Sequence, residues 1–167
     1  MRYLIITIIL STVLGCSKFN GKQSSSQKET GYGNTKFELK PNQTIISEDV
    51  NSIGSLGKSF KSWDPEPGDI GDAESILKYA FDDQKRGTVN RVLGKLPDDY
   101  NQQYVGAVNE NGDKYLWVNL FCKTEESYFK EWKTKLVFAK DGGKCFVNVK
   151  INLTKKTYEE FNVNGDA

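Results

Sequence analysis

The residues best suited to chemistry in this sequence are its three cysteines, because the chain contains no histidine. Histidine is the commonest general base and the commonest metal ligand in proteins. An enzyme built on this chain would therefore depend on carboxylate, lysine, tyrosine or cysteine side chains. A cysteine nucleophile would lack a histidine to activate it. We expect no metal site, no cofactor and no catalytic residue.

Cys16 ends a segment that is typical of a secretory signal. A short basic start, Met1-Arg2, precedes an apolar run from Tyr3 to Leu14. A run of this length is too short to span a bilayer and fits the hydrophobic region of a signal peptide. Its end, Val13-Leu14-Gly15-Cys16, resembles a bacterial lipobox. That resemblance implies that residues 1–15 are cleaved and that Cys16 carries lipid; the alternative is an ordinary signal peptide with an incidental cysteine.

Residues 16–35 are polar, with Phe19 and Tyr32 as the only large apolar or aromatic side chains. Such a segment cannot bury enough surface to offset its ordering entropy, so we expect a flexible tether. The lipid would make the membrane a partner of the chain. Ser17 is not the acidic residue associated with inner-membrane retention, which favours the outer membrane of a bacterial cell envelope.

Cys122 and Cys145 are the remaining cysteines, and both fall on inward-facing positions of predicted strands. An even pair outside the cytoplasm often forms a disulfide. A further strand predicted at 135–140 would, however, lie between them in a meander, and two strand spacings total roughly 9–10 Å, beyond the usual reach of a bridge. A disulfide and two buried free thiols both remain open.

Residues 36–167 have the pattern of a single α+β domain. Apolar positions at spacings of three and four predict one main helix over about 69–85, with Asp69 or Asp72 as its cap. Alternating residues predict strands at 36–40, 103–108, 114–123, 135–140, 144–154 and 158–164, with 51–62 as loop, a short helical turn within 88–101 and a short helix at 124–134. The resulting fold class is one helix packed on a four- to five-stranded antiparallel meander sheet.

One face of this sheet should meet the helix and form the core. The predicted core set is Ile76, Leu77, Ala80, Phe81, Leu116, Val118, Leu120, Val147, Val149 and Ile151. The opposite face carries aromatic and polar side chains: Tyr115, Trp117, Asn119, Phe121, Phe146, Asn148, Lys150 and Asn152. Such groups suit a carbohydrate or protein partner. The alternative is that the segment at 124–134 or the N-terminal strand covers them.

The order of elements over 36–163 is similar to that of the cystatin-like and NTF2-like α+β rolls. The closing run, residues 141–154 followed by Val163-Asn164-Gly165, resembles uncharacterised small bacterial lipoproteins, particularly from the Bacteroidetes. The second resemblance implies no activity. The cystatin inhibitor pattern Gln-x-Val-x-Gly is not matched, because Gln103-Tyr104-Val105-Gly106 lacks one spacer.

The net charge of the chain limits the classes of partner that it is expected to bind. The formal net charge is +1, and beyond the predicted signal the charges balance, so there is no electrostatic basis for nucleic-acid binding. The leading hypothesis is a membrane-anchored, non-enzymatic binding module with a protein or glycan partner. Two alternatives remain: an inhibitor or immunity-type protein that blocks a partner enzyme, and a carboxylate-dependent enzyme with a pocket inside the sheet.

Overall fold

The computed structural model describes residues 37–47, 50–87 and 94–165. The predicted signal peptide, Cys16 and the tether lie outside these ranges. Within them, no helix combines the length and the apolar character needed to cross a membrane.

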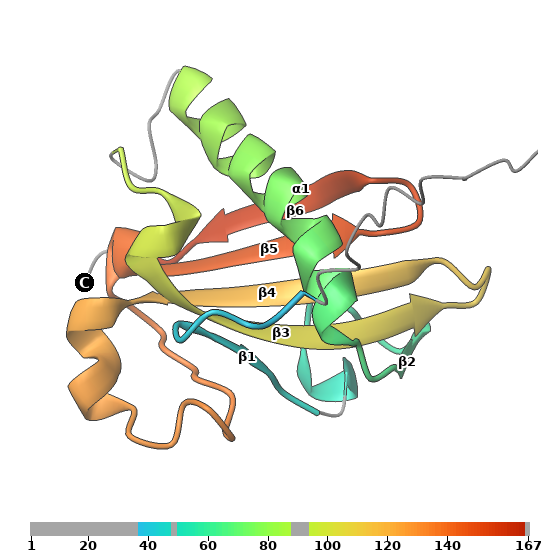
Figure 1. The fold of residues 1–167 in the computed structure, drawn as a ribbon, viewed down its shortest axis with the longest axis horizontal. Helices are drawn as coiled ribbons and strands as arrows, with labels where there is room; N and C mark the ends of the chain where they lie inside the picture. The colour runs from blue at the N-terminus through green and yellow to red at the C-terminus, as the bar shows by residue number, and fades with distance from the viewer. Residues whose placement is uncertain (1–36, 48–49, 88–93, 166–167) are drawn as a thin grey trace, which may run out of the picture. The chain divides into compact units, whose positions relative to one another are not determined.

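An open, mostly antiparallel sheet forms the centre of the fold (Figure 1). Its six strands are β1 (Gln43–Ile45), β2 (Phe60–Ser62), β3 (Tyr100–Asn109), β4 (Lys114–Cys122), β5 (Phe146–Asn152) and β6 (Thr157–Val163). Strands β3 to β6 are antiparallel neighbours in chain order, so the predicted meander is confirmed. On the other edge of β3, β1 pairs in parallel and β2 pairs antiparallel, so the sheet has six strands rather than the predicted four to five and is not wholly antiparallel.

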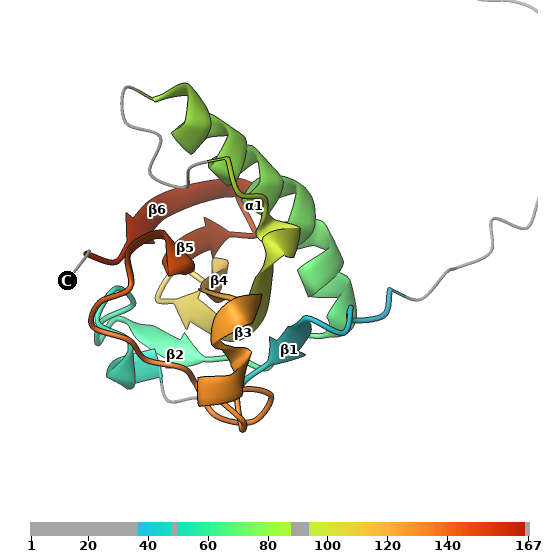
Figure 2. The same cartoon turned by 90° about the vertical axis from the view of Figure 1, so that its left-hand side faces the viewer.

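The longest helix among the described residues, α1 (Pro67–Arg86), covers one face of the sheet (Figure 2). Pro67 stands at its start, where a missing backbone N–H costs no hydrogen bond. The cap is Glu66, so the prediction of Asp69 or Asp72 as the cap is wrong; the Asp69 carboxylate instead accepts a hydrogen bond from the Glu66 N–H at 2.8 Å and supports the first turn. The helix ends where the Gly87 N–H donates to the Asp83 carbonyl.

The main core lies between α1 and the sheet, as the sequence predicts. Every residue of the predicted core set belongs to this cluster, with Ile76 only partly buried. The cluster also contains Tyr100 and Tyr104 from β3, both fully buried. The α+β class and the assignment of strand faces are therefore confirmed.

Residues 135–140, however, form no strand, and that prediction is wrong. The Val137 N–H donates to the Gln103 side-chain oxygen at 2.9 Å, and the Val137 carbonyl accepts from the Asn119 amide at 2.7 Å. Side chains of the sheet thus satisfy the backbone groups that a neighbouring strand would otherwise pair. With no strand inserted there, β4 and β5 pair directly.

Other boundaries also differ from the sequence predictions. The edge strand is Gln43–Ile45 rather than 36–40, and the loop predicted at 51–62 contains β2. The helix predicted at 124–134 is a 3-10 helix, η3 (Lys123–Tyr128), followed by turns. Three further 3-10 turns are η1 (Val50–Ser52), η2 (Pro97–Asp99) and η4 (Gly143–Cys145).

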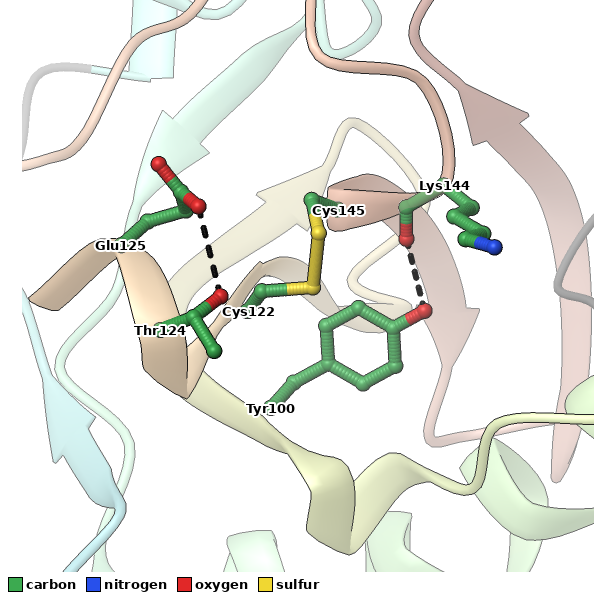
Figure 3. The surroundings of a disulfide bond; sticks show 6 residues. All are labelled: Tyr100, Cys122, Thr124, Glu125, Lys144 and Cys145. Carbon is green, nitrogen blue, oxygen red and sulfur yellow. Dashed lines mark hydrogen bonds between the residues drawn. A yellow bond between two sulfur atoms is a disulfide. The ribbon is translucent and has the colours of Figure 1, made fainter.

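Cys122 and Cys145 form a disulfide with a Cα–Cα distance of 4.8 Å (Figure 3). Phe121 pairs with Phe146 at the end of the β4–β5 ladder, so the next residue on each side brings the two cysteines face to face. Beside the bridge, the Tyr100 hydroxyl donates to the Lys144 carbonyl at 2.7 Å. The disulfide closes the segment 123–144, called the covering loop below.

Candidate functional site

The sheet face opposite α1, called the outer face, lies beneath two segments that carry no long helix or strand. Val50, Ile53 and Leu56 pack against Tyr115 and Trp117. At the other end, Trp132 and Val137 of the covering loop pack against Phe121 and Phe146. The four aromatic residues of the predicted ligand face are all buried, with exposed fractions of 9% or less. That face is therefore no open surface: the two segments exclude water from most of it.

Between the two covering segments the outer face remains accessible through a pocket of about 210 Å³, called the amide pocket. Its floor consists of Trp117 and Asn119 from β4 together with Phe146 and Asn148 from β5. The remaining lining residues are Ser52, Ile53, Gly54, Ser55, Val137, Phe138, Ala139, Asn162 and Asn164. Four of the eight predicted face residues thus meet in one concave site.

Side-chain amides form a row across the sheet beneath and beside this pocket. Gln103 pairs with Asn119, Asn119 with Asn148, and Asn148 with Asn162, one residue on each of four neighbouring strands. We call these four residues the amide row. Residues in register on neighbouring strands lie close together on the same face. The strand register therefore explains why these distant positions converge.

The buried end of the amide row holds the covering loop in place. Gln103 is fully buried and donates to the carbonyls of Trp132 (2.5 Å) and Lys135 (2.7 Å). Its side-chain oxygen accepts from the Asn119 amide at 2.9 Å as well as from Val137. Near the end of β6, Asn164 donates to the Ala139 carbonyl at 2.7 Å. These bonds position the wall 137–139 of the pocket.

The open end of the row presents hydrogen-bonding groups to the pocket. Asn148 donates to the Asn119 oxygen at 2.8 Å and is only partly buried, and Asn162 is exposed. On the opposite wall, the Ser55 hydroxyl oxygen is buried and has no hydrogen-bond partner among the described residues. An unpaired buried hydroxyl is costly, so this wall contains a polar group that the described residues leave unsatisfied.

None of the described residues that line the amide pocket has an ionisable side chain. The other predicted face residues, apart from Phe121, belong to a polar cluster that borders the pocket, since Lys150 donates to the Ser55 carbonyl at 3.5 Å. Lys150 forms ion pairs with Glu159 and Glu160, and the Tyr115 hydroxyl donates to Glu159 at 2.9 Å. Burial, followed by that hydrogen bond, raises the pKa of Tyr115. The Asn152 amide also donates to Glu159.

Sequence reasoning missed several residues of the site, chiefly Ser55, Phe138, Asn162 and Asn164. Side chains alternate along the last strand, so Asn162 lies on the face opposite to that of the inward-facing Phe161. Pairing this strand with its neighbour in the predicted meander would have brought Asn162 beside Asn148. Ser55 lies in a segment without a repeating pattern, and Phe138 lies in the predicted strand at 135–140 that the structure does not form, so the sequence carries no correct signal for either residue.

No protein family, curated protein or solved structure compared with this chain matches it. The described residues also contain no group of three or more histidine, cysteine, aspartate or glutamate side chains that could hold a metal ion. The proposals below therefore stand on the geometry of the amide pocket and on the sequence.

Proposed function

We propose that this protein is a small bacterial lipoprotein whose folded domain is a non-enzymatic binding module. Lipid on Cys16 would attach it to the cell envelope, with the outer membrane favoured, and residues 16–35 would give it reach. The helix and meander sheet support the similarity to cystatin-like and NTF2-like rolls at the level of element order. The Bacteroidetes-type lipoproteins are the expected relatives.

The observation that carries this proposal is the lining of the amide pocket. Small-molecule sites combine aromatic walls with a few placed polar groups, and this pocket has Trp117 and Phe146 beside Asn119 and Asn148. Because no described lining residue is ionisable, the pocket offers hydrogen bonds and apolar contact without a proton donor or acceptor that titrates near neutral pH. These properties support binding of an uncharged polar ligand.

The rival hypothesis of a carboxylate-dependent enzyme requires acidic side chains that converge on a ligand site. On β6, the carboxylates of Glu159 and Glu160 lie near the pocket in sequence, and both pair with Lys150. They belong to the polar cluster around Lys150 and do not line the pocket. This arrangement favours the binding module over the enzyme.

Gly54 offers a way to test the proposal without disturbing the core. It lines the pocket, its backbone is not in the left-handed region, and a Cβ built there meets no atom within 4 Å. Gly54→Trp should therefore fold and obstruct the pocket. We expect the full wild-type chain to co-sediment with insoluble envelope polymers and the Gly54→Trp chain to remain in the supernatant.

Gly68 provides the matched control, because its Cβ position is equally open and it lies on α1, away from the pocket. Gly68→Trp should sediment like the wild-type chain. Equal sedimentation of all three chains would refute binding through this pocket. Release of soluble fragments from the polymer by the wild-type chain, detected by mass spectrometry, would favour the enzyme instead.

Blocking of a partner enzyme is the second candidate, and exposed aromatic side chains favour it. Phe138 and Tyr128 on the covering loop are 64% and 78% exposed. Large exposed aromatics are enriched at protein interfaces. If this candidate is correct, Phe138→Ser and Tyr128→Ser should weaken inhibition of that enzyme, whereas Gly54→Trp acts only on ligands of the pocket.

A further inference from the structure

We infer that the amide pocket binds one neutral sugar ring, such as the exposed end of an envelope glycan. This inference rests on the proposed function and specifies its ligand. It is carried by three independent properties of the site: flat aromatic surfaces, hydrogen-bonding groups suited to hydroxyls, and a small volume without charge.

The aromatic surfaces lie on two sides of the pocket. Trp117 and Phe146 contribute to the floor, and Phe138 stands at the rim with a 64% exposed side chain. The faces of aromatic rings are electron-rich and attract polarised C–H groups, which a pyranose ring presents on its flat sides. An aromatic floor and rim can therefore contact a sugar ring while its hydroxyls point elsewhere.

The polar groups match hydroxyls, each of which both donates and accepts. A side-chain amide has a carbonyl oxygen and an NH₂ group and can therefore pair with two adjacent hydroxyls. Asn148 and Asn162 present such amides from neighbouring strands. The Ser55 hydroxyl, which has no partner among the described residues, is closed to solvent, so it would pair with the ring only after its side chain rotates toward the pocket.

The size of the pocket and the charge of its lining restrict the class of ligand further. The volume of about 210 Å³ is below the range of about 300–1,000 Å³ for drug-sized ligands, so one ring fits better than a long segment. The absence of ionisable groups among the described lining residues favours a neutral sugar over an acidic one. The nearby Lys150, which donates to the Ser55 carbonyl, is already paired with Glu159 and Glu160, so a charged ligand would lose its hydration without a free partner of opposite charge.

A peptide strand is the less favoured ligand because the backbone of one wall is already engaged. Gln103 and Asn119 occupy the N–H and carbonyl of Val137, and Asn164 occupies the carbonyl of Ala139. An extended peptide binds an exposed edge mainly through free backbone groups. This wall therefore offers little for strand addition, whereas side-chain amides remain available to hydroxyls.

Nuclear magnetic resonance of the full chain, in a detergent without a sugar headgroup, tests this inference. The probes are methyl glucoside, its charged counterpart glucuronic acid, and the peptide mimic N-acetylalanine methylamide. We expect methyl glucoside to cause saturable shifts of the Asn148 and Asn162 side-chain amides and of the Phe138 backbone amide. Glucuronic acid and the peptide mimic should cause smaller shifts or none.

Three variants test the roles of individual groups. Asn162→Ala and Asn148→Ala should each weaken methyl glucoside binding by about fivefold, the effect of one lost hydrogen bond. Asn162 is exposed, so its replacement should not impair folding even if that of Asn148 does. Asn111→Ala, in the exposed β3–β4 turn, is the matched control and should bind like the wild-type chain.

The outcomes separate this inference from the proposed function. Shifts caused by the peptide mimic alone would overturn the sugar ligand, while the binding module would stand. The absence of pocket shifts with every probe would also overturn the sugar ligand. The proposed function instead fails if Gly54→Trp sediments with envelope polymers as well as the wild-type chain does.

Discussion

Gln103 shows how one side chain can determine where a loop lies. Its amide makes hydrogen bonds with three backbone groups of the covering loop and one neighbouring amide, all in a fully buried position. Buried polar groups of this kind contribute modestly when paired and are costly when a partner is removed. The position of the covering loop thus depends on a residue far from it in sequence.

Replacing Gln103 by leucine should destabilise the protein strongly. Gln103→Leu would leave two carbonyls and one N–H of the covering loop without their partners, at about 1–3 kcal/mol for each buried group. We expect the free energy of unfolding, measured with denaturant, to fall by at least about 3 kcal/mol. Asn111→Leu in the exposed β3–β4 turn is the control; a similar loss in both variants would contradict the role of Gln103.

Tyr104 should make stability depend on alkaline pH. Burial raises the pKa of Tyr104 above its ordinary value of 10.0. The unfolded chain therefore releases this proton at lower pH than the folded chain, so stability is fully present below pH 10 and is lost as the pH rises above it. The expected loss due to Tyr104 is about 1.4 kcal/mol per pH unit.

Denaturant titrations between about pH 8 and 11.5 measure this slope. Tyr104→Phe removes the ionisable group and should show a shallower decline than the wild-type chain, even though it loses the hydrogen bond to Gln102 at 2.6 Å. Tyr128→Phe is the control, because Tyr128 is 78% exposed. Identical slopes for the wild-type chain and Tyr104→Phe would contradict the assignment.

At the scale of elements, the disulfide and the amide row act on the same segment. The bridge joins the two ends of the covering loop, and the row holds its middle. A bridge that closes a loop of this size stabilises a fold by about 3 kcal/mol, mainly by restricting the unfolded chain. Since residues 137–139 line the amide pocket, the bridge also supports the site.

The double variant Cys122→Ser, Cys145→Ser should lower the free energy of unfolding by about 3 kcal/mol. Backbone amides in the covering loop should also exchange with solvent faster than in the wild-type chain, because the loop ends are no longer joined. A reducing agent added to the wild-type chain serves as the control and should reproduce both effects. Unchanged stability in the double variant would show that the bridge is dispensable.

The long regular elements could be predicted from the sequence, whereas the short edge strands β1 and β2 and most of the covering segments could not. Alternation identified β4 and β5, and helical spacing identified α1, because each buries one apolar face. The strand predicted at 135–140 failed because its apolar residues pack on the outer face while its backbone pairs with Gln103 and Asn119. Such pairing depends on tertiary contacts that no local pattern records.

Part of the candidate site could be predicted, because strand alternation alone determines which residues share a face. Strand alternation placed Trp117, Asn119, Phe146 and Asn148 on one face, and all four line the pocket. The alternative that the segment at 124–134 covers this face is confirmed in part, because Trp132 packs on Phe121 and Phe146, whereas the cover from residues 50–56 was not predicted. Ser55 and Phe138, which complete the pocket, come from the covering segments.

At the scale of the whole molecule, attachment to the membrane through lipid on Cys16 is a prediction that does not depend on the fold. Cys16→Ser removes the thiol that would carry lipid, so the variant should partition into the aqueous phase of a detergent separation. The wild-type chain should enter the detergent phase, and its intact mass should include acyl chains, since each buried methylene adds about 0.8 kcal/mol to membrane affinity. A wild-type chain without acyl mass would leave only a secreted binding module.

Hydrogen exchange of the full chain, free and bound to envelope polymers, tests the central claim most directly. A ligand in the amide pocket touches two walls that lie far apart in sequence. We predict that binding slows amide exchange both at 52–55 and at 137–139, the two walls of the pocket. Protection confined to α1, with both walls exchanging as fast as in the free chain, would contradict the account.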